Sequence, residues 1–249
     1  MTYILICVIG FFAAMVDSMV GGGGLISLPA LIATGMPTHL ALGTNKFASG
    51  SGAISSSITY IKSGNVNKRL MKVLFPCSLI GSAIGVKVVL GLNPDFLKAI
   101  IIFLVAIIGI YTLMNKELGL TDNYIEPDKK KMVKGVGLAG FFGFYDGFFG
   151  PGTGSFLIFG LINIFALDFK KAAANAKVLN LASNLMAAII FLFSGQVAFQ
   201  YGVPMAISMI VGAKVGAHLA IKGGSKFIKP IFVIVSFLLV TKMGIDLIM

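Results

Sequence analysis

Two lysines and two aspartates lie within otherwise apolar stretches, and their types and spacing make them the first candidates for chemistry. Lys46 follows Gly43-Thr44-Asn45, and Lys177 follows Asn175-Ala176, so both cations have polar neighbours in the chain. An ionisable side chain inside a membrane span is costly and by default marks a functional site. The alternative is that each lysine, being near the end of its segment, extends to the lipid headgroups. Their equivalent positions in the two halves of the chain favour a site for a substrate or a coupling ion.

Asp17 and Asp146 are the acidic residues best placed inside the apolar stretches. Three roles compete for them: they could neutralise the two lysines, cap a broken helix, or carry a coupled proton. The residue types leave the first two roles unranked. Both aspartates are therefore candidates for proton coupling, and sodium is the other coupling ion to consider.

A glycine-rich loop follows each aspartate: Gly21-Gly22-Gly23-Gly24 in the first half and Gly150-Pro151-Gly152-Thr153-Gly154 in the second. Each glycine costs about 1 kcal/mol relative to alanine inside a helix, so both loops are expected to break the helix. The helix that starts after such a loop presents unpaired N–H groups and a partial positive charge, which suits a small oxyanion. The glycines could instead, or in addition, let helices cross closely.

Asn180 and Asn184 place two amides on one face of a further apolar segment, with Ser183 beside them. They could form hydrogen bonds between helices or line a pathway, and the sequence favours neither. Their counterparts in the first half are Ser49, Ala53 and Gly52, so the two halves differ chemically. The candidate substrate-binding residues are Gly21, Gly22, Gly23, Gly24, Thr44, Asn45, Lys46, Gly152, Thr153, Gly154, Asn175, Lys177 and Asn180.

The composition is that of an integral membrane protein. Of 249 residues, 57% are hydrophobic and 12% are charged, and the mean hydropathy is +0.97. Soluble domains carry about 25% charged residues. The net charge of +11 belongs mostly to loop lysines, which meet anionic lipid, so no nucleic-acid partner is expected. The two cysteines, Cys7 and Cys77, lie in apolar runs, and we expect no disulfide, metal, cofactor or catalytic residue.

The hydrophobic pattern predicts an all-α chain, at about 20 residues for each membrane crossing. Leu25 to Thr34 is too short to cross unaided. Lys116 to Lys134 is a long polar linker, which divides the chain into a first transmembrane repeat at 1–115, a cytoplasmic linker at 116–133 and a second repeat at 134–249. The longer apolar segments include Tyr3 to Val20, Leu40 to Lys62, Leu70 to Leu92, Phe96 to Met114, Val203 to Ile221 and Phe227 to Met249.

The second half repeats the first at an offset of 129 to 131 residues. Asp17 matches Asp146, and Lys46 matches Lys177. The same offset relates Gly21, Gly23, Gly81 and Gly85 to Gly150, Gly152, Gly212 and Gly216. An ordered series of such matches is not expected by chance, so the sequence predicts two structurally similar halves.

The loop charges indicate how the halves are related. With five membrane segments in each half, fourteen of the 20 Lys and Arg residues fall on one face, and only Lys98 falls on the other. If the short segments turn back instead, the split becomes nine against six. The positive-inside rule favours the first arrangement, which is an inverted repeat with both termini extracytoplasmic. The fourteen are Lys62, Lys68, Arg69, Lys72, Lys116, Lys129, Lys130, Lys131, Lys134, Lys170, Lys171, Lys222, Lys226 and Lys229.

Several motifs recur in order along the chain: the four glycines leading to Pro29-Ala30-Leu31, Ala41-Leu42-Gly43-Thr44-Asn45-Lys46, Tyr60 with Gly64-Asn65-Val66, Ala174-Asn175-Ala176-Lys177-Val178-Leu179-Asn180, and Gly195-Gln196-Val197. In these motifs the chain resembles the TauE/SafE family of sulfite and organosulfonate permeases. The resemblance implies multi-span secondary transport of sulfur-containing anions such as sulfite, thiosulfate or organosulfonates. One departure is that Ile158 or Phe159 stands where a proline matching Pro29 would be expected, so the second short helix should be straighter or contribute less to the site.

The residues and the resemblance together predict a multi-pass permease of the cell membrane for a small anion, with alternating access around a site between the halves. An anion channel, or a transporter of another small oxyanion or carboxylate, is the alternative. An intramembrane enzyme is disfavoured because no histidine lies in the middle of a span to act as a base. A homo-oligomer is compatible with the many small residues, which could pack between subunits as well as within one.

Overall fold

The structure, a computed structural model, describes residues 2–93 and 122–248, with side chains described for 3–93 and 122–224. All regular structure in these ranges is helical. The predicted segment Phe96 to Met114 lies outside the described residues. The helices are α1 (Thr2–Val20), α2 (Gly24–Ile32), α3 (Thr38–Lys62), α4 (Lys68–Leu90), α6 (Lys129–Phe148), α7 (Thr153–Phe165), α8 (Phe169–Phe193) and α9 (Phe199–Ile248).

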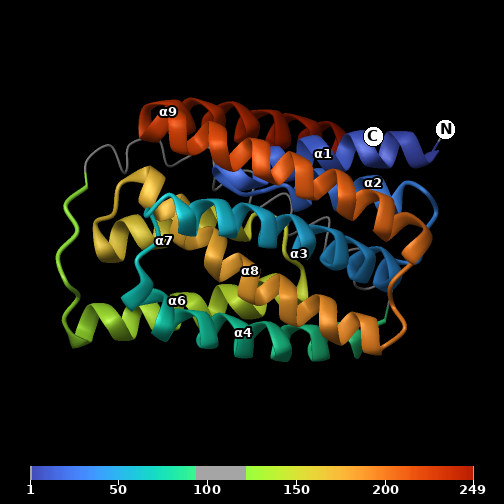
Figure 1. The fold of residues 1–249 in the computed structure, drawn as a ribbon. Coiled ribbons are helices and arrows are strands. Elements are labelled where there is room, and N and C mark those ends of the chain that lie inside the picture. The colour runs from blue at the N-terminus through green and yellow to red at the C-terminus, as the bar shows by residue number, and fades with distance from the viewer. Residues whose placement is uncertain (1, 94–121, 249) are drawn as a thin grey trace.

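The long helices lie side by side, and helices from the two halves of the chain alternate (Figure 1). α1 packs along α9, and α4 packs along α6. α3 and α8 contact each other between these two layers, and the short helices α2 and α7 lie close to them. The buried apolar side chains form two clusters, one around Tyr60, Leu74 and Phe165 and the other around Leu28, Phe149 and Phe191.

Four described helices are long and apolar enough to cross a membrane: Tyr3–Val20, Lys68–Leu90, Phe169–Phe193 and Phe199–Gly224. These segments belong to α1, α4, α8 and the first part of α9. α7 is a shorter apolar helix. α3 is long enough at 25 residues but contains many Gly, Ser and Thr residues. The described part of the chain is therefore a multi-pass helical membrane protein.

Glycines allow the two outer helix pairs to touch through their backbones. A Cβ atom on Gly212 or Gly216 of α9 would overlap the carbonyl oxygens of Phe11 and Met15 in α1. On α4, Gly81 and Gly85 stand in the same way against the carbonyls of Gly140 and Phe144 in α6. Helix association in a membrane depends on such close van der Waals packing because lipid is as apolar as the side chains. These four glycines therefore allow the paired helices to pack closely.

The two glycine-rich loops do break the helices, as the sequence predicts. Gly21 has φ 77° and Gly150 has φ 100°, a region that residues with a side chain seldom adopt. α2 is only nine residues long and contains Pro29, whereas α7 has 13 residues and no proline. The two short helices thus differ in length as well as in sequence.

The start of α6 differs from the sequence prediction, whereas the break within α9 agrees with it. α6 begins at Lys129, inside the predicted linker, because the Asp128 side chain caps it by accepting a hydrogen bond from the Lys131 amide. The predicted segments Val203 to Ile221 and Phe227 to Met249 correspond to the two parts of α9, which meet at a kink at Gly224, where the backbone angles are not helical. A single glycine with positive φ is enough to change the direction of the chain there without a loop.

Candidate functional site

The two lysines and two aspartates form ion pairs between the two halves of the chain. The Nζ of Lys46 on α3 lies 2.8 Å from Oδ1 of Asp146 on α6. The Nζ of Lys177 on α8 pairs with Oδ2 of Asp17 on α1. Each lysine therefore finds the aspartate of the opposite half. All four side chains are half-buried or buried, and the four formal charges sum to zero.

Asp146 is almost fully enclosed by hydrogen-bond donors. Its side chain is 2% exposed, and Oδ1 accepts from Lys46. Oδ2 accepts from the amide nitrogens of Asn180 and Asn184, at 3.2 and 2.9 Å, and from the hydroxyl of Ser183. Asn180, Ser183 and Asn184 are consecutive positions on one face of α8, so this helix face is built around a single carboxylate. A charge so deeply buried needs such donors to offset its lost hydration.

Asp17 has a different environment. Its Oδ2 pairs with Lys177, while Oδ1 accepts a hydrogen bond of 3.0 Å from the backbone N–H of Gly23, at the start of α2. Its side chain is 24% exposed, against 4% for Lys177. Asp17 thus combines two of the roles considered from sequence: it neutralises a lysine and satisfies an N–H of the broken helix.

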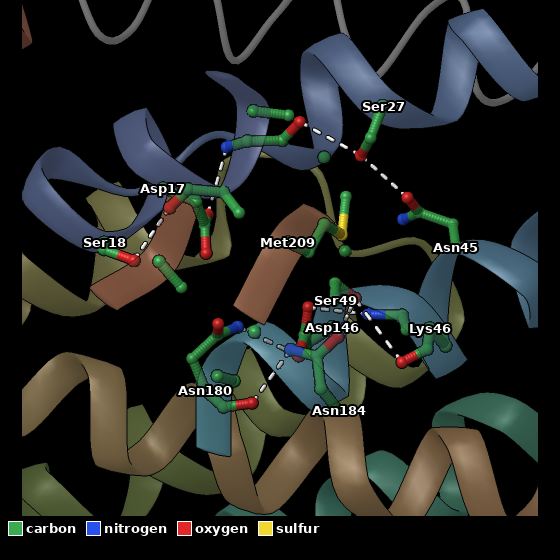
Figure 2. Close-up of a pocket in the computed structure, with 18 residues that line it drawn as sticks. Asp17, Ser18, Ser27, Asn45, Lys46, Ser49, Asp146, Asn180, Asn184 and Met209 are labelled. Atoms are coloured by element: carbon green, nitrogen blue, oxygen red, sulfur yellow. Dashed lines mark hydrogen bonds and ion pairs between the residues drawn. The ribbon is translucent and has the colours of Figure 1, made fainter. Parts of the chain in front are cut away.

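A small cavity separates the two aspartates. It offers ≈ 30 Å³ to the centre of a water molecule, which is room for a water or two in this conformation. The lining combines both carboxylates with Lys46, the amides of α3 and α8, and Gly23 and Gly24 at the start of α2. Figure 2 shows Asp17 and Ser18 on one side of this space and Asp146, Asn180 and Asn184 on another.

Two further hydrogen bonds fix the rim of the cavity. The Ser27 hydroxyl of α2 donates to Oδ1 of Asn45 on α3 at 2.7 Å, and the Ser49 hydroxyl of α3 donates to Oδ1 of Asn184 on α8 at 3.0 Å (Figure 2). No fully buried side-chain nitrogen or oxygen within the described residues lacks a partner. The site is therefore a closed polar network, in which any bound ion must exchange with an existing contact.

The structure brings some of the predicted site residues to the cavity and leaves others outside it. Asp17, Gly23, Gly24, Asn45, Lys46, Asp146 and Asn180 line it. Lys177 is one step removed, since its Nζ reaches Asp17 and lies 3.4 Å from Oδ1 of Asn180. The predicted residues that do not line the cavity are Gly21, Gly22, Thr44, Gly152, Thr153, Gly154 and Asn175.

Thr44 and Asn175 each accept a hydrogen bond from the start of a long helix. The Thr44 hydroxyl accepts a hydrogen bond from the N–H of Ala198, just before α9, at 2.9 Å. Asn175 accepts one from the N–H of Asn67, just before α4, also at 2.9 Å. The two residues are equivalent in the repeat, and each ties the start of a long helix to the middle of the protein.

The two glycine-rich loops pack against each other through Gly21 and Gly154. A Cβ on Gly21 would overlap the backbone of Gly154 and Ser155, and Gly24 stands against Pro151. The Ser155 hydroxyl donates to the carbonyl of Val20 at 3.1 Å. The start of α7 is thus covered by the first loop, while the start of α2 faces the cavity. Gly150 is the contribution of the second loop to the lining.

Sequence reasoning missed Ser27 and Met209, which also line the cavity. Ser27 lies three residues after Gly24 on α2, so it belongs to the first turn after the loop that was already a candidate. Met209 gives no signal in the sequence, because an apolar residue within an apolar helix has no distinguishing pattern. It reaches the site through the contact of α9 with α3.

An all-helical chain with membrane-spanning helices around a charged cavity defines the class as a multi-pass membrane protein. The profile of the family described as sulfite exporter TauE/SafE matches residues 6–243. The chain belongs to this family of membrane transporters, which confirms the resemblance drawn from its motifs.

Individual relatives agree with this assignment. A probable membrane transporter protein of Haemophilus influenzae is 39% identical over 247 residues, covering 98% of this chain and 94% of that protein. The probable membrane transporter protein YfcA of Escherichia coli K12 is 36% identical over 244 residues, covering 95% and 88%. YunE of Bacillus subtilis, also a probable membrane transporter protein, is 26% identical over 262 residues, covering 96% of each. No solved structure matches the chain.

Proposed function

We propose that this membrane transporter is a secondary permease for small sulfur-containing anions such as sulfite, thiosulfate or organosulfonates. The observation that carries the proposal is the pair of buried Lys–Asp contacts between the halves, beside a cavity at the start of the broken helix α2. The family description as sulfite exporters supports the choice of substrate. The ion pairs also support it, because an anion could replace an aspartate as the partner of a lysine.

Anion binding in this site is a competition with the two aspartates. An oxyanion entering the cavity would take Lys46 from Asp146 and accept hydrogen bonds from the Asn45 amide and from the N–H of Gly23, which now donates to Asp17. The cavity in this conformation accommodates only water, so binding requires the surrounding helices to move apart. We propose that this movement is part of alternating access, with one group of helices moving against another around a site near the middle of the membrane.

The inverted repeat belongs to the same proposal. Its support is that the contacts of one half recur in the other at the same offset: Lys46 with Asp146 and Lys177 with Asp17, Gly81 with Gly140 and Gly212 with Phe11, Asn175 with Asn67 and Thr44 with Ala198. In each case a residue of one half contacts the other half. We place both termini on the extracytoplasmic side, from the distribution of loop lysines.

The test is flux through liposomes that contain the purified protein. Liposomes loaded with unlabelled sulfite are diluted into labelled sulfite, and labelled methanesulfonate and acetate are compared under the same conditions. A secondary transporter gives saturable uptake driven by the internal anion, that is, counterflow. Uptake that rises linearly with concentration and shows no counterflow would instead indicate an anion channel. Counterflow with acetate but with no sulfur anion would overturn the substrate assignment.

A further inference from the structure

Asp17 and Asp146 are equivalent in the repeat, but their carboxylates are held differently. Asp146 accepts hydrogen bonds from four side chains and is 2% exposed. Within the described residues, Asp17 accepts from one side chain, Lys177, and from the backbone N–H of Gly23, and it is 24% exposed. The two carboxylates therefore differ in the number of hydrogen-bond donors that would have to rearrange if a proton bound to them.

The difference originates in the sequences of α3 and α8. The three α8 donors to Asp146 are Asn180, Ser183 and Asn184. At the offset of 131 residues, the equivalent positions on α3 are Ser49, Gly52 and Ala53. Gly52 and Ala53 have no side-chain donor, and the Ser49 hydroxyl is directed to Asn184. The first half therefore cannot build around Asp17 the enclosure that the second half builds around Asp146.

A proton would have different consequences at the two positions. On Oδ2 of Asp146 it would place an O–H among three neutral donors that share this acceptor, and on Oδ1 it would displace the buried Lys46 ammonium from its partner. On Asp17 it would displace only the Lys177 ammonium from Oδ2, while Oδ1 could keep the Gly23 N–H. The carboxylate of Asp17 lines the cavity, which has room for water, and its side chain is 24% exposed, against 2% for Asp146.

Charge balance gives such a proton a function. The two lysines and two aspartates are neutral together, so a monovalent anion entering the cavity adds an uncompensated negative charge in a poorly hydrated site. One proton on Asp17 restores the balance and releases Lys177, whose Nζ lies 3.4 Å from Oδ1 of Asn180 in the cavity lining. We propose that Asp17 binds the proton that accompanies each monovalent anion, whereas Asp146 stays ionised throughout. This inference rests on the proposed anion-transport function.

The other charged and titratable groups around Asp17 lie on α3, α6 and α8. On α8 and α3 the groups facing it are Lys177, Lys46 and Tyr60, whose hydroxyl donates to the carbonyl of Ser18 at 2.7 Å. Asp146 of α6 lines the same cavity. α2 and α7 carry no titratable side chain. On α9 the lining residues are Met209 and Ala213, and Lys214 and His218 line a separate groove.

The experiment compares Asp17→Asn with Asp146→Asn in liposomes free of sodium, using methanesulfonate, whose charge does not change with pH as that of sulfite does. The measured quantity is the ratio of uptake with and without an inward proton gradient. We expect a ratio well above one for the wild type, a ratio near one for Asp17→Asn, and recovery of the wild-type ratio in Asp17→Glu. Asp146→Asn is expected to lower both fluxes while its residual flux keeps the wild-type ratio.

A second measurement serves variants whose flux is too small for the ratio of uptake with and without the proton gradient to be determined. Proton uptake on addition of methanesulfonate to detergent-solubilised, monodisperse protein in weak buffer is expected to be about one per bound anion in the wild type, absent in Asp17→Asn, and present in Asp146→Asn. A gradient response or proton uptake that persists in Asp17→Asn overturns the inference. Wild-type flux that does not change with the proton gradient also overturns the inference but leaves the transporter function intact. Absence of wild-type flux with every sulfur anion overturns the proposed function itself.

Discussion

Lys46 and Asp146 lie 100 residues apart in the chain, yet their charged groups are 2.8 Å apart and both side chains are 2% exposed. The pair joins α3 of the first half to α6 of the second. Its repeat-related partner, Lys177 with Asp17, joins α8 to α1. These two contacts connect the halves at the cavity. Changes to them should affect both stability and transport, and the two effects can be measured separately.

Removing one member of the buried pair should destabilise the protein more than removing both. Lys46→Met leaves the Asp146 carboxylate without its cation, and breaking a buried pair in this way costs about 3–5 kcal/mol. The double variant Lys46→Met with Asp146→Asn leaves no unpaired charge, so its melting temperature should recover most of the loss. Circular dichroism in detergent measures this, because the chain has no tryptophan for a fluorescence assay.

Transport should not recover in the same double variant, since Lys46 is the proposed partner of the anion. Lys177→Met should also abolish flux in a protein that still inserts into the membrane. Wild-type flux in both Lys46→Met and Lys177→Met would remove the lysines from the mechanism and leave the ion pairs with a purely structural role.

The first glycine-rich loop should be intolerant of any side chain at Gly21. This residue has φ 77°, and a Cβ there would overlap the backbone of Gly154 and Ser155. Gly21→Ala is therefore expected to separate the two loops and reduce flux by about tenfold or more, equivalent to at least about 1.4 kcal/mol. Gly64 is the matched control: its φ is 75°, but nothing lies within 4 Å of the added atom. Equal effects of the two alanines would show that backbone strain alone, about 1–2 kcal/mol, explains both.

The glycines between α1 and α9 should be needed for close packing. Gly216→Ala places a methyl group against the carbonyl of Met15, and we expect a loss of about 1–3 kcal/mol as the helices move apart. Gly137→Ala on α6 meets no atom within 4 Å and should leave the melting temperature unchanged or slightly raised, because alanine favours a helix. A drop of similar size in both variants would contradict a specific packing role for Gly216.

The orientation of the halves can be tested with single cysteines. Ser63 and Ser194 are equivalent in the repeat, and both are exposed in the loops after α3 and α8. In a background with Cys7 and Cys77 replaced by alanine, an inverted repeat places Ser63→Cys on the cytoplasmic face and Ser194→Cys on the opposite face. A membrane-impermeant maleimide added to intact cells should then label only Ser194→Cys. Labelling of both from the same side would exclude the inverted arrangement.

Much of the site could be predicted because its chemistry is unusual for its surroundings. A charged residue in an apolar stretch is costly, so Asp17, Lys46, Asp146 and Lys177 were visible from sequence alone. The glycine-rich loops were visible because four successive glycines cannot continue a helix. Thr44 and Asn175 are polar residues of the same kind, yet they bind the starts of α9 and α4 outside the cavity, because a polar side chain in a span also serves backbone groups that lipid cannot satisfy.

The sequence by itself determined the membrane class, the helical segments, the duplicated pattern and the family, because hydropathy, glycine content and motif order can be read along the chain and do not depend on which helices meet. Which lysine pairs with which aspartate was decided by the tertiary structure alone. Local spacing would allow each lysine to pair within its own half, and only the packing of α3 against α8, with α6 and α1 beside them, brings Lys46 to Asp146 and Lys177 to Asp17. The enclosure of Asp146 by α8 has the same origin, since hydrogen bonds between helices depend on which faces meet.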